Sequence, residues 1–211
     1  MTILSRRRFL LGSLVSAAFG SSANAEIRCA PHRILGQICR AEVRFSANVA
    51  VHDPQYQSQW YWAACLSTIF EFHGHPVSQQ RIVREVYGAP VNMPAFSGTV
   101  ISAQLNRRWV DDNGNRYRLK AVFDTDAEFA AINNAGIVGA LRRDMPMIIG
   151  ARSHAVVLTA IDFTPTPNGP RIHAGECFDP WPGRGARSLA PDELVPVPRG
   201  SLRFIALPEI A

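Results

Sequence analysis

Between Gln55 and Gly74 a polar, glutamine-rich segment gives way to a run of hydrophobic positions. The apolar residues of this run are Ala64, Leu66, Ile69, Phe70 and Phe72. On a helix they would lie on all sides and leave no polar face, which is not the pattern of a surface helix. Gly74 supplies the C-terminal stop. The pattern therefore predicts a helix that is buried in the centre of a domain and entered from a polar loop.

Three further helices are predicted from the same kind of periodicity. Ser78 is a suitable N-cap for a helix over residues 79–87, which ends before Gly88. A helix over residues 99–110 and a longer one over residues 126–143 each carry an apolar face. Pro146 follows the end of the last of these helices.

Strand-like runs dominate the second half of the chain. A turn at residues 111–115 leads into a strand over 117–123, and further strands are expected at 147–150, 155–163, 171–178 and 202–207. One helical turn is expected at residues 191–194, and a short strand at Glu42–Phe45 within an otherwise loop-like N-terminal segment. Because helices come first and antiparallel strands second, the sequence predicts an α+β fold with a helical lobe and a sheet lobe.

The N-terminal residues differ in kind from the rest. A twin-arginine opening at residues 5–12 is followed by a modest apolar run and the small-residue site Ala23-Asn24-Ala25. The apolar run is shorter than the roughly 20 residues that span a membrane. We therefore interpret residues 1–25 as an export signal cut after Ala25, which implies a periplasmic or secreted protein with no stable membrane span. Residues 26–53 form an N-terminal extension.

Removing this signal changes the charge of the chain. The signal holds Arg6, Arg7 and Arg8 and no acidic residue, so 22 basic residues fall to 19 against 17 acidic ones, and the net charge falls from +5 to +2. Because no run of lysine or arginine remains, the sequence carries no signature of a nucleic-acid-binding protein.

Four cysteines follow the signal. In an oxidising compartment Cys29 and Cys39, ten positions apart, could form a disulfide that closes a short loop, although sequence alone does not fix the pairing. Cys65 lies within the predicted central helix and Cys177 within a predicted strand. Both are compatible with buried, structural thiols.

A cysteine peptidase places its nucleophile at a helix N-terminus and needs a histidine base, a group that orients the histidine, and an oxyanion donor. Three such positions are present: Gln55 before the helix, His154 at the head of a strand and Asp179 at the end of the next strand. In these motifs residues 50–207 resemble bacterial papain-like cysteine peptidases, including type III effector proteases and peptidases that trim bacteriocin leaders. The resemblance implies a papain-like domain over residues 54–211, with the central helix packed on the sheet lobe.

The fourth motif position departs from that family. Its members carry Cys-Trp-Ala-Ala where this chain reads Tyr61-Trp62-Ala63-Ala64, so tyrosine occupies the nucleophile position. A phenol with a pKa of about 10 is a poor acyl acceptor at neutral pH. Cys65 is the alternative nucleophile, since Gln59 precedes it by the same six residues that separate Gln55 from Tyr61. It would lie about 6 Å deeper along the helix, away from the N-terminal dipole.

The resemblance leaves three hypotheses for function. The first is a catalytically degenerate peptidase homologue that binds a peptide or protein in its remnant cleft. The second is an active cysteine peptidase that uses Cys65 with His154 and Asp179, and the third is a structural or interaction module without a functional cleft. No cofactor is implied, and His73 and His75 lack a third ligand at a useful spacing for a metal.

Overall fold

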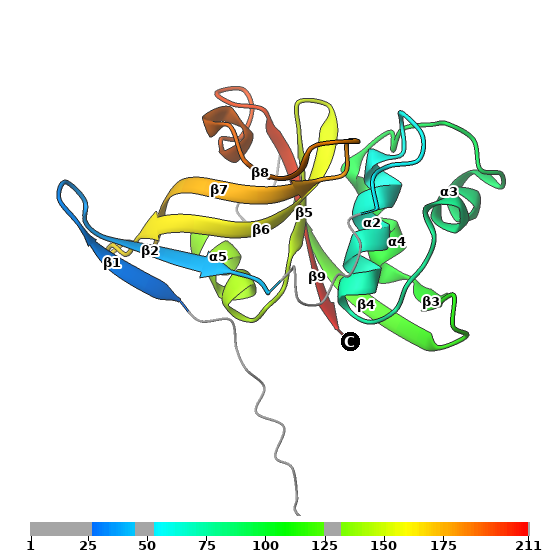
Figure 1. Cartoon of the computed structure of the whole chain (residues 1–211), viewed down its shortest axis with the longest axis horizontal. Coiled ribbons are helices and arrows are strands. Elements are labelled where there is room, and N and C mark those ends of the chain that lie inside the picture. Colours follow the sequence, from blue (N-terminus) through cyan, green and yellow to red (C-terminus); the bar gives the residue numbers. More distant parts are fainter. Residues whose placement is uncertain (1–26, 45–52, 125–131, 211) are drawn as a thin grey trace, which may run out of the picture.

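The computed structural model describes residues 27–44, 53–124 and 132–210, so the predicted export signal lies outside the described residues. The side chains of residues 121–124 and 209–210 are likewise not described. The helices between residues 61 and 106 gather at one end of the molecule, and a broad sheet extends to the other end (Figure 1). This arrangement confirms the α+β prediction. None of the helices in the described ranges is long and apolar enough to cross a membrane.

The helical end is organised around α2 (Tyr61–Phe72), as the hydrophobic pattern predicts. Trp62, Leu66, Ile69 and Phe70 on this helix are fully buried, and Gly74 adopts a positive φ of 80° after its last turn. Around it lie α3 (Gln79–Tyr87) and α4 (Gly98–Asn106) (Figure 1). Burial of α2 on both sides explains why its sequence lacks a polar face.

The sheet has a long central strand, β6 (His154–Thr164), which is antiparallel to each neighbour. One edge of β6 pairs with β5 (Met147–Ala151) and then with β2 (Gly36–Glu42), while its other edge pairs with β7 (Arg171–Asp179). These contacts bury most of β6 and bring its first residues beside the end of β7.

The outer strands complete the sheet. β9 (Leu202–Ile210) lies between β5 and β4 (Arg116–Asp124), and β4 pairs with β3 (Arg108–Val110). β8 (Gly185–Ser188) pairs with β7, and the 3-10 helix η1 (Pro191–Leu194) follows it. α5 (Asn134–Arg142) covers one face of the sheet (Figure 1).

The N-terminal segment corrects one prediction. Instead of a loop with a strand at Glu42–Phe45, the structure has a hairpin of β1 (Arg28–His32) and β2, and β2 ends at Glu42. Cys29 and Cys39 face each other across this hairpin and form the disulfide that their spacing allowed. A short, exposed strand such as β1 shows little hydrophobic alternation, which is why its sequence resembles a loop.

Two helix predictions also need correction. The helix expected over residues 99–110 ends at Asn106, because the chain turns there and Trp109 is buried in β3 with its indole donating to the Gln104 carbonyl at 2.8 Å. The helix expected from residue 126 includes Asn134–Arg142, and residues 125–131 lie outside the described residues. Asn133 caps this helix by accepting from the Gly136 amide at 2.9 Å, so Ile132 precedes the helix.

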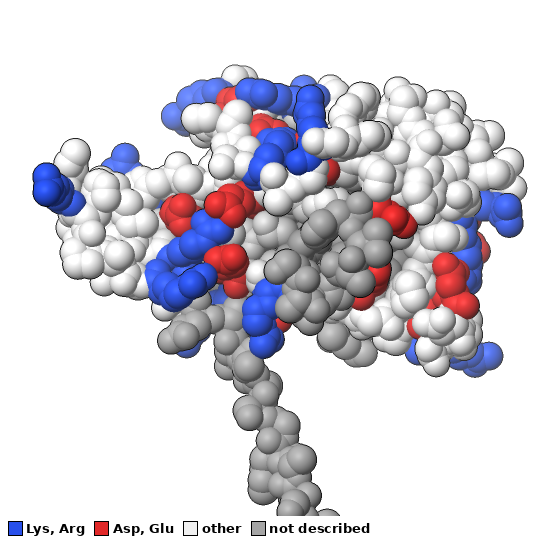
Figure 2. Space-filling model, viewed as in Figure 1, with Lys and Arg blue, Asp and Glu red and all other residues white. Residues whose placement is uncertain are grey.

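On the face shown in Figure 2, basic and acidic side chains are interspersed over the sheet end and do not form one uniform patch. Arg40 illustrates the pattern, because it pairs with Glu42 on its own strand, with Asp162 on β6 and with Glu176 on β7. Such networks satisfy the charges of the surface locally.

Candidate functional site

A tight turn between β5 and β6 holds His154 at the end of the sheet. β5 and β6 are joined by Arg152 and Ser153, and Ala151 pairs with His154 on either side of this two-residue connection. Both connecting residues have positive φ, 51° and 59°, which suits the right-handed twist of a hairpin but is unfavourable for residues other than glycine. The turn fixes His154 as the first residue of β6, as its sequence context predicts.

Asp179, the last residue of β7, meets His154. Its carboxylate is completely buried and lies 2.8 Å from His154 Nε2. The backbone amide of Trp181 donates to the same carboxylate at 3.0 Å, and Arg187 Nε donates to it at 2.8 Å. Burial alone would raise the pKa of Asp179, but these hydrogen bonds outweigh it and hold the pKa well below its ordinary value. Because an ionised carboxylate only accepts, Nε2 of His154 carries the proton of this hydrogen bond, and Nδ1 is the ring nitrogen that does not face Asp179.

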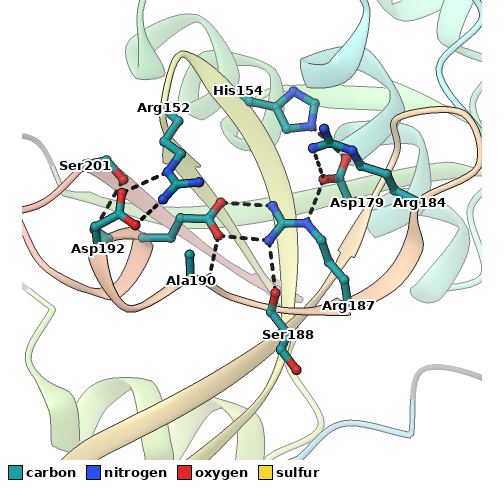
Figure 3. A network of polar contacts seen from close by, with 10 residues as sticks. Arg152, His154, Asp179, Arg184, Arg187, Ser188, Ala190, Asp192 and Ser201 are labelled. Carbon is teal, nitrogen blue, oxygen red and sulfur yellow. Dashed lines mark hydrogen bonds and ion pairs between the residues drawn. The ribbon is translucent and has the colours of Figure 1, made fainter.

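Behind Asp179 lies an ionic network that the sequence did not suggest. Arg187 on β8 joins Asp179 to Glu193 on η1, since its two Nη atoms donate to the Glu193 carboxylate at 2.8 and 2.9 Å (Figure 3). The Ala190 amide also donates to Glu193 at 2.8 Å. Glu193 is buried and its pKa lies below the ordinary value, because the hydrogen bonds from Arg187 and Ala190 outweigh its burial. The network ties the pair of His154 and Asp179 to β8 and η1.

Tyr61 is the first residue of α2 and lies against the histidine. The phenol and imidazole rings meet edge to face, with centroids 5.1 Å apart. Burial, with a smaller effect of Tyr87, raises the pKa of Tyr61 above its ordinary value, so the phenol is neutral at physiological pH. The structure thus brings together Tyr61, His154 and Asp179, three of the residues singled out in the sequence.

Cys65 lies one turn deeper in α2 and is completely buried. Burial raises the pKa of its thiol well above the ordinary value, and the Asp179 carboxylate adds to this effect. Burial also raises the pKa of Cys177 to about 12. Both thiols are therefore protonated and shielded, which is opposite to what a nucleophile requires.

Gln55 is buried beside the site, but its amide is directed into its own loop. Its Nε2 donates to the carbonyls of Gln57 at 3.0 Å and Ser58 at 2.9 Å, while its backbone amide donates to the Pro180 carbonyl at 2.8 Å. These bonds fasten the loop before α2 to the end of β7. The predicted oxyanion role would require these donors to be released, whereas Gln59 lines the cleft directly.

Two tryptophans fix the far wall of the cleft. The indoles of Trp60 and Trp62 donate to the carbonyls of Val91 at 2.9 Å and Met93 at 3.1 Å. They thereby hold the segment that leads to Pro94, Ala95 and Phe96 against the N-terminus of α2. This explains why the sequence has indoles at these two buried positions.

A cleft extends on both sides of Tyr61 and His154. The first hollow, of about 620 Å³, lies between the α3–α4 connection and the β5–β9 region, and we call it the apolar hollow. The second, of about 610 Å³, lies between the loop before α2 and the β7–β8 region, and we call it the arginine hollow. Tyr61, Ser153 and His154 line both, so a ligand that fills the two hollows must cross this pair of rings.

The histidines at the end of α2 belong to a separate cluster. His75 Nδ1 lies 2.9 Å from Asp111, and its ring stacks on Tyr117 with centroids 4.3 Å apart. Within the described ranges, no three histidine, cysteine or acidic side chains are grouped closely enough to hold a metal ion. The contacts with Asp111 and Tyr117 indicate that His75 has a structural role in the fold.

Comparison with known proteins identifies structural similarity only. No protein-family model matches the chain, and no curated protein sequence matches it. Among solved structures, the crystal structure of UfSP from C. elegans is similar with a TM-score of 0.48 and 15% identity. The match covers 88% of this chain but 38% of UfSP, so the chain spans less than half the length of that protein.

Proposed function

We propose that this protein is an exported papain-like cysteine peptidase homologue that binds peptide segments in its cleft without cleaving them. The observation that carries the proposal is Tyr61, which stands at the start of α2 against the ring of His154, the place where the resembled peptidases carry a thiol. The paired His154 and Asp179 retain the geometry of a base and its orienting group.

The chemistry of Tyr61 supports loss of hydrolysis. A neutral phenol is a weak nucleophile, and the raised pKa of Tyr61 makes it weaker still. The Cys65 alternative is less favoured, because that thiol is buried, protonated and absent from the described lining of either hollow. The cleft itself persists on both sides of the ring pair, which favours binding over a purely structural role.

The proposal can be tested by measuring retention and cleavage of the same peptides. A mixture of synthetic peptides is passed over the immobilised protein, and mass spectrometry identifies the peptides that are retained and any new termini. We expect retention without cleavage. New termini that disappear after iodoacetamide treatment would overturn the proposal in favour of an active cysteine peptidase.

A matched pair of variants locates the binding surface. Phe96 lines the apolar hollow and is 71% exposed, so Phe96→Asp should reduce retention while the protein still folds. Ile34, in the β1–β2 turn, is 87% exposed and distant from the cleft. Ile34→Asp should therefore leave retention unchanged; equal effects of the two substitutions would argue against binding in the cleft.

A further inference from the structure

The arginines that line the arginine hollow differ in how many of their hydrogen-bond donors are used by carboxylates of the protein. Arg187 directs its donors at Asp179 and Glu193, as described above. Arg152, in the β5–β6 turn, makes a two-pronged ion pair with Asp192, in which Nε lies 2.8 Å from the carboxylate (Figure 3). Both guanidinium groups are therefore held by carboxylates of the protein itself.

Arg184 is different. Its contact with a carboxylate is one long interaction of 3.4 Å between Nη1 and Asp179 Oδ2, an oxygen that Arg187 already approaches at 2.8 Å. The Arg184 side chain is 57% exposed, and its guanidinium lies 6.0 Å from the ring of Trp181, which also lines the hollow. Of the three arginines in this hollow, Arg184 has the most donors available to a ligand.

The apolar hollow, on the other side of Tyr61 and His154, is lined mainly by apolar side chains. Its walls include Pro94, Ala95, Phe96, Ile101 and Phe204. Arg203 is the one arginine, lysine, aspartate or glutamate in the described part of this lining. An apolar side chain of a ligand would be desolvated here at little cost in polar contacts.

From this asymmetry we infer that the cleft selects an extended peptide segment that carries a bulky apolar side chain and, a few residues away, a carboxylate. The apolar side chain occupies the apolar hollow, the backbone crosses Tyr61 and His154, and the carboxylate accepts hydrogen bonds from Arg184. This inference rests on the proposed function and names the ligand class of the same cleft.

The test uses fluorescein-labelled, C-terminally amidated peptides of alanine and serine. Each carries one phenylalanine and one glutamate, separated by one to four residues in either order. A second set replaces glutamate by glutamine, and a third set combines that glutamine with a free C-terminal carboxylate. Fluorescence anisotropy gives the Kd of each peptide for the wild type, Arg184→Gln and Arg203→Gln.

We expect the best glutamate peptide to bind about three- to tenfold more tightly than its glutamine counterpart, the range of a partly exposed charge-assisted hydrogen bond. Arg184→Gln should abolish this preference without changing the Kd of the glutamine peptide. Arg203→Gln, which removes the same charge from the other hollow, should preserve the preference. If the third set binds more tightly than the best glutamate peptide, the carboxylate that Arg184 prefers is the C-terminal carboxylate of the ligand.

The outcomes separate this inference from the proposed function. If phenylalanine peptides bind but glutamate and glutamine are equivalent, the carboxylate preference is wrong and peptide binding stands. A preference that survives Arg184→Gln or is lost in Arg203→Gln overturns the assignment to Arg184. If no peptide binds, both the proposed function and the inference are overturned.

Discussion

The phenol ring of Tyr61 and the imidazole of His154 meet edge to face, with centroids 5.1 Å apart, at the junction of α2 and β6. The contact joins the helical end of the molecule to the sheet. It also divides the cleft into its apolar and arginine hollows. Whatever enters the cleft therefore encounters an aromatic pair, with a neutral phenol where a peptidase would present a thiolate.

Introducing a thiol at residue 61 should produce a reactive cysteine. In Tyr61→Cys the new side chain begins a helix and faces His154, and both features lower a thiol pKa. We expect alkylation by iodoacetamide at pH 6.5 to be about five- to tenfold faster than that of free cysteine, after allowance for the weaker nucleophilicity of a low-pKa thiol. Peptide mapping by mass spectrometry assigns the modified residue.

The control for that experiment is the double variant Tyr61→Cys/His154→Gln. It retains the helix position but removes the imidazole, so its alkylation rate should fall toward that of an ordinary thiol. If the single variant folds correctly and reacts no faster than free cysteine, the site lacks the geometry of a cysteine peptidase.

Replacing Arg187 should lower the free energy of unfolding. Arg187→Met leaves the buried carboxylates of Asp179 and Glu193 without their shared cation. Because the Arg187 side chain is partly exposed, we expect a loss of about 2–3 kcal/mol in the free energy of unfolding, somewhat less than the roughly 3–5 kcal/mol for a fully buried pair. Urea denaturation followed by circular dichroism measures this change.

Exposed Arg171 at the start of β7 provides a comparison for Arg187. Arg171→Met should change the free energy of unfolding by less than about 0.5 kcal/mol. Adding Glu193→Gln to Arg187→Met should cost less than the sum of the single substitutions, because the second change removes a charge that the first left unpaired. Strict additivity would contradict a coupled network.

Gly150 allows Phe204 to lie on the β5 backbone. A Cβ atom at residue 150 would overlap the Phe204 ring, and both residues line the apolar hollow. Gly150→Ala should displace that ring, lower the free energy of unfolding by about 1–3 kcal/mol and weaken peptide binding. Gly139→Ala in α5 is the control, since its Cβ would meet only Arg143 Nη1 at 3.4 Å and a helical alanine is favoured by up to about 1 kcal/mol.

Stability should also fall in mildly acidic solution because of His73. Burial, and to a smaller extent the neighbouring His75, lowers the pKa of His73 to about 4. The unfolded chain, with a histidine pKa of about 6.5, takes up the proton at higher pH than the folded protein. The stabilising contribution of the neutral His73 to the free energy of unfolding is therefore complete above pH 6.5 and is lost as the pH falls toward 4.

Between pH 7 and 5.5 the expected loss is about 1 kcal/mol in the free energy of unfolding. His73→Leu should flatten this dependence, whereas His173→Gln at an exposed position of β7 should leave it in place. Urea midpoints at the two pH values provide the measurement. An identical slope in wild type and His73→Leu would exclude His73 as its source.

The parts of the fold that could be predicted are those whose sequence pattern is long. The apolar run of α2 and the strands β6 and β7 extend over enough residues to reveal their period, and the strand ends place His154 beside Asp179. β1 and β8 are short and largely exposed, so they carry little signal. The ionic network was missed because Arg187 lies on β8 and because arginine and glutamate are usually exposed.

The side-chain direction of Gln55 could not be predicted either. Its position before α2 agrees with the resemblance, yet the local carbonyls of Gln57 and Ser58 compete for its amide. Such a choice depends on the exact path of a loop, which residue spacing does not specify. The oxyanion role of Gln55 therefore stays a prediction.

The position of Tyr61 also has a genetic consequence. Tyrosine and cysteine codons differ only in their second base, so a single nucleotide transition would place a thiol at the start of α2. The imidazole, its carboxylate and the arginine behind them already stand in place and would need no further substitution. A population carrying this gene is thus one point mutation away from presenting a thiol to His154.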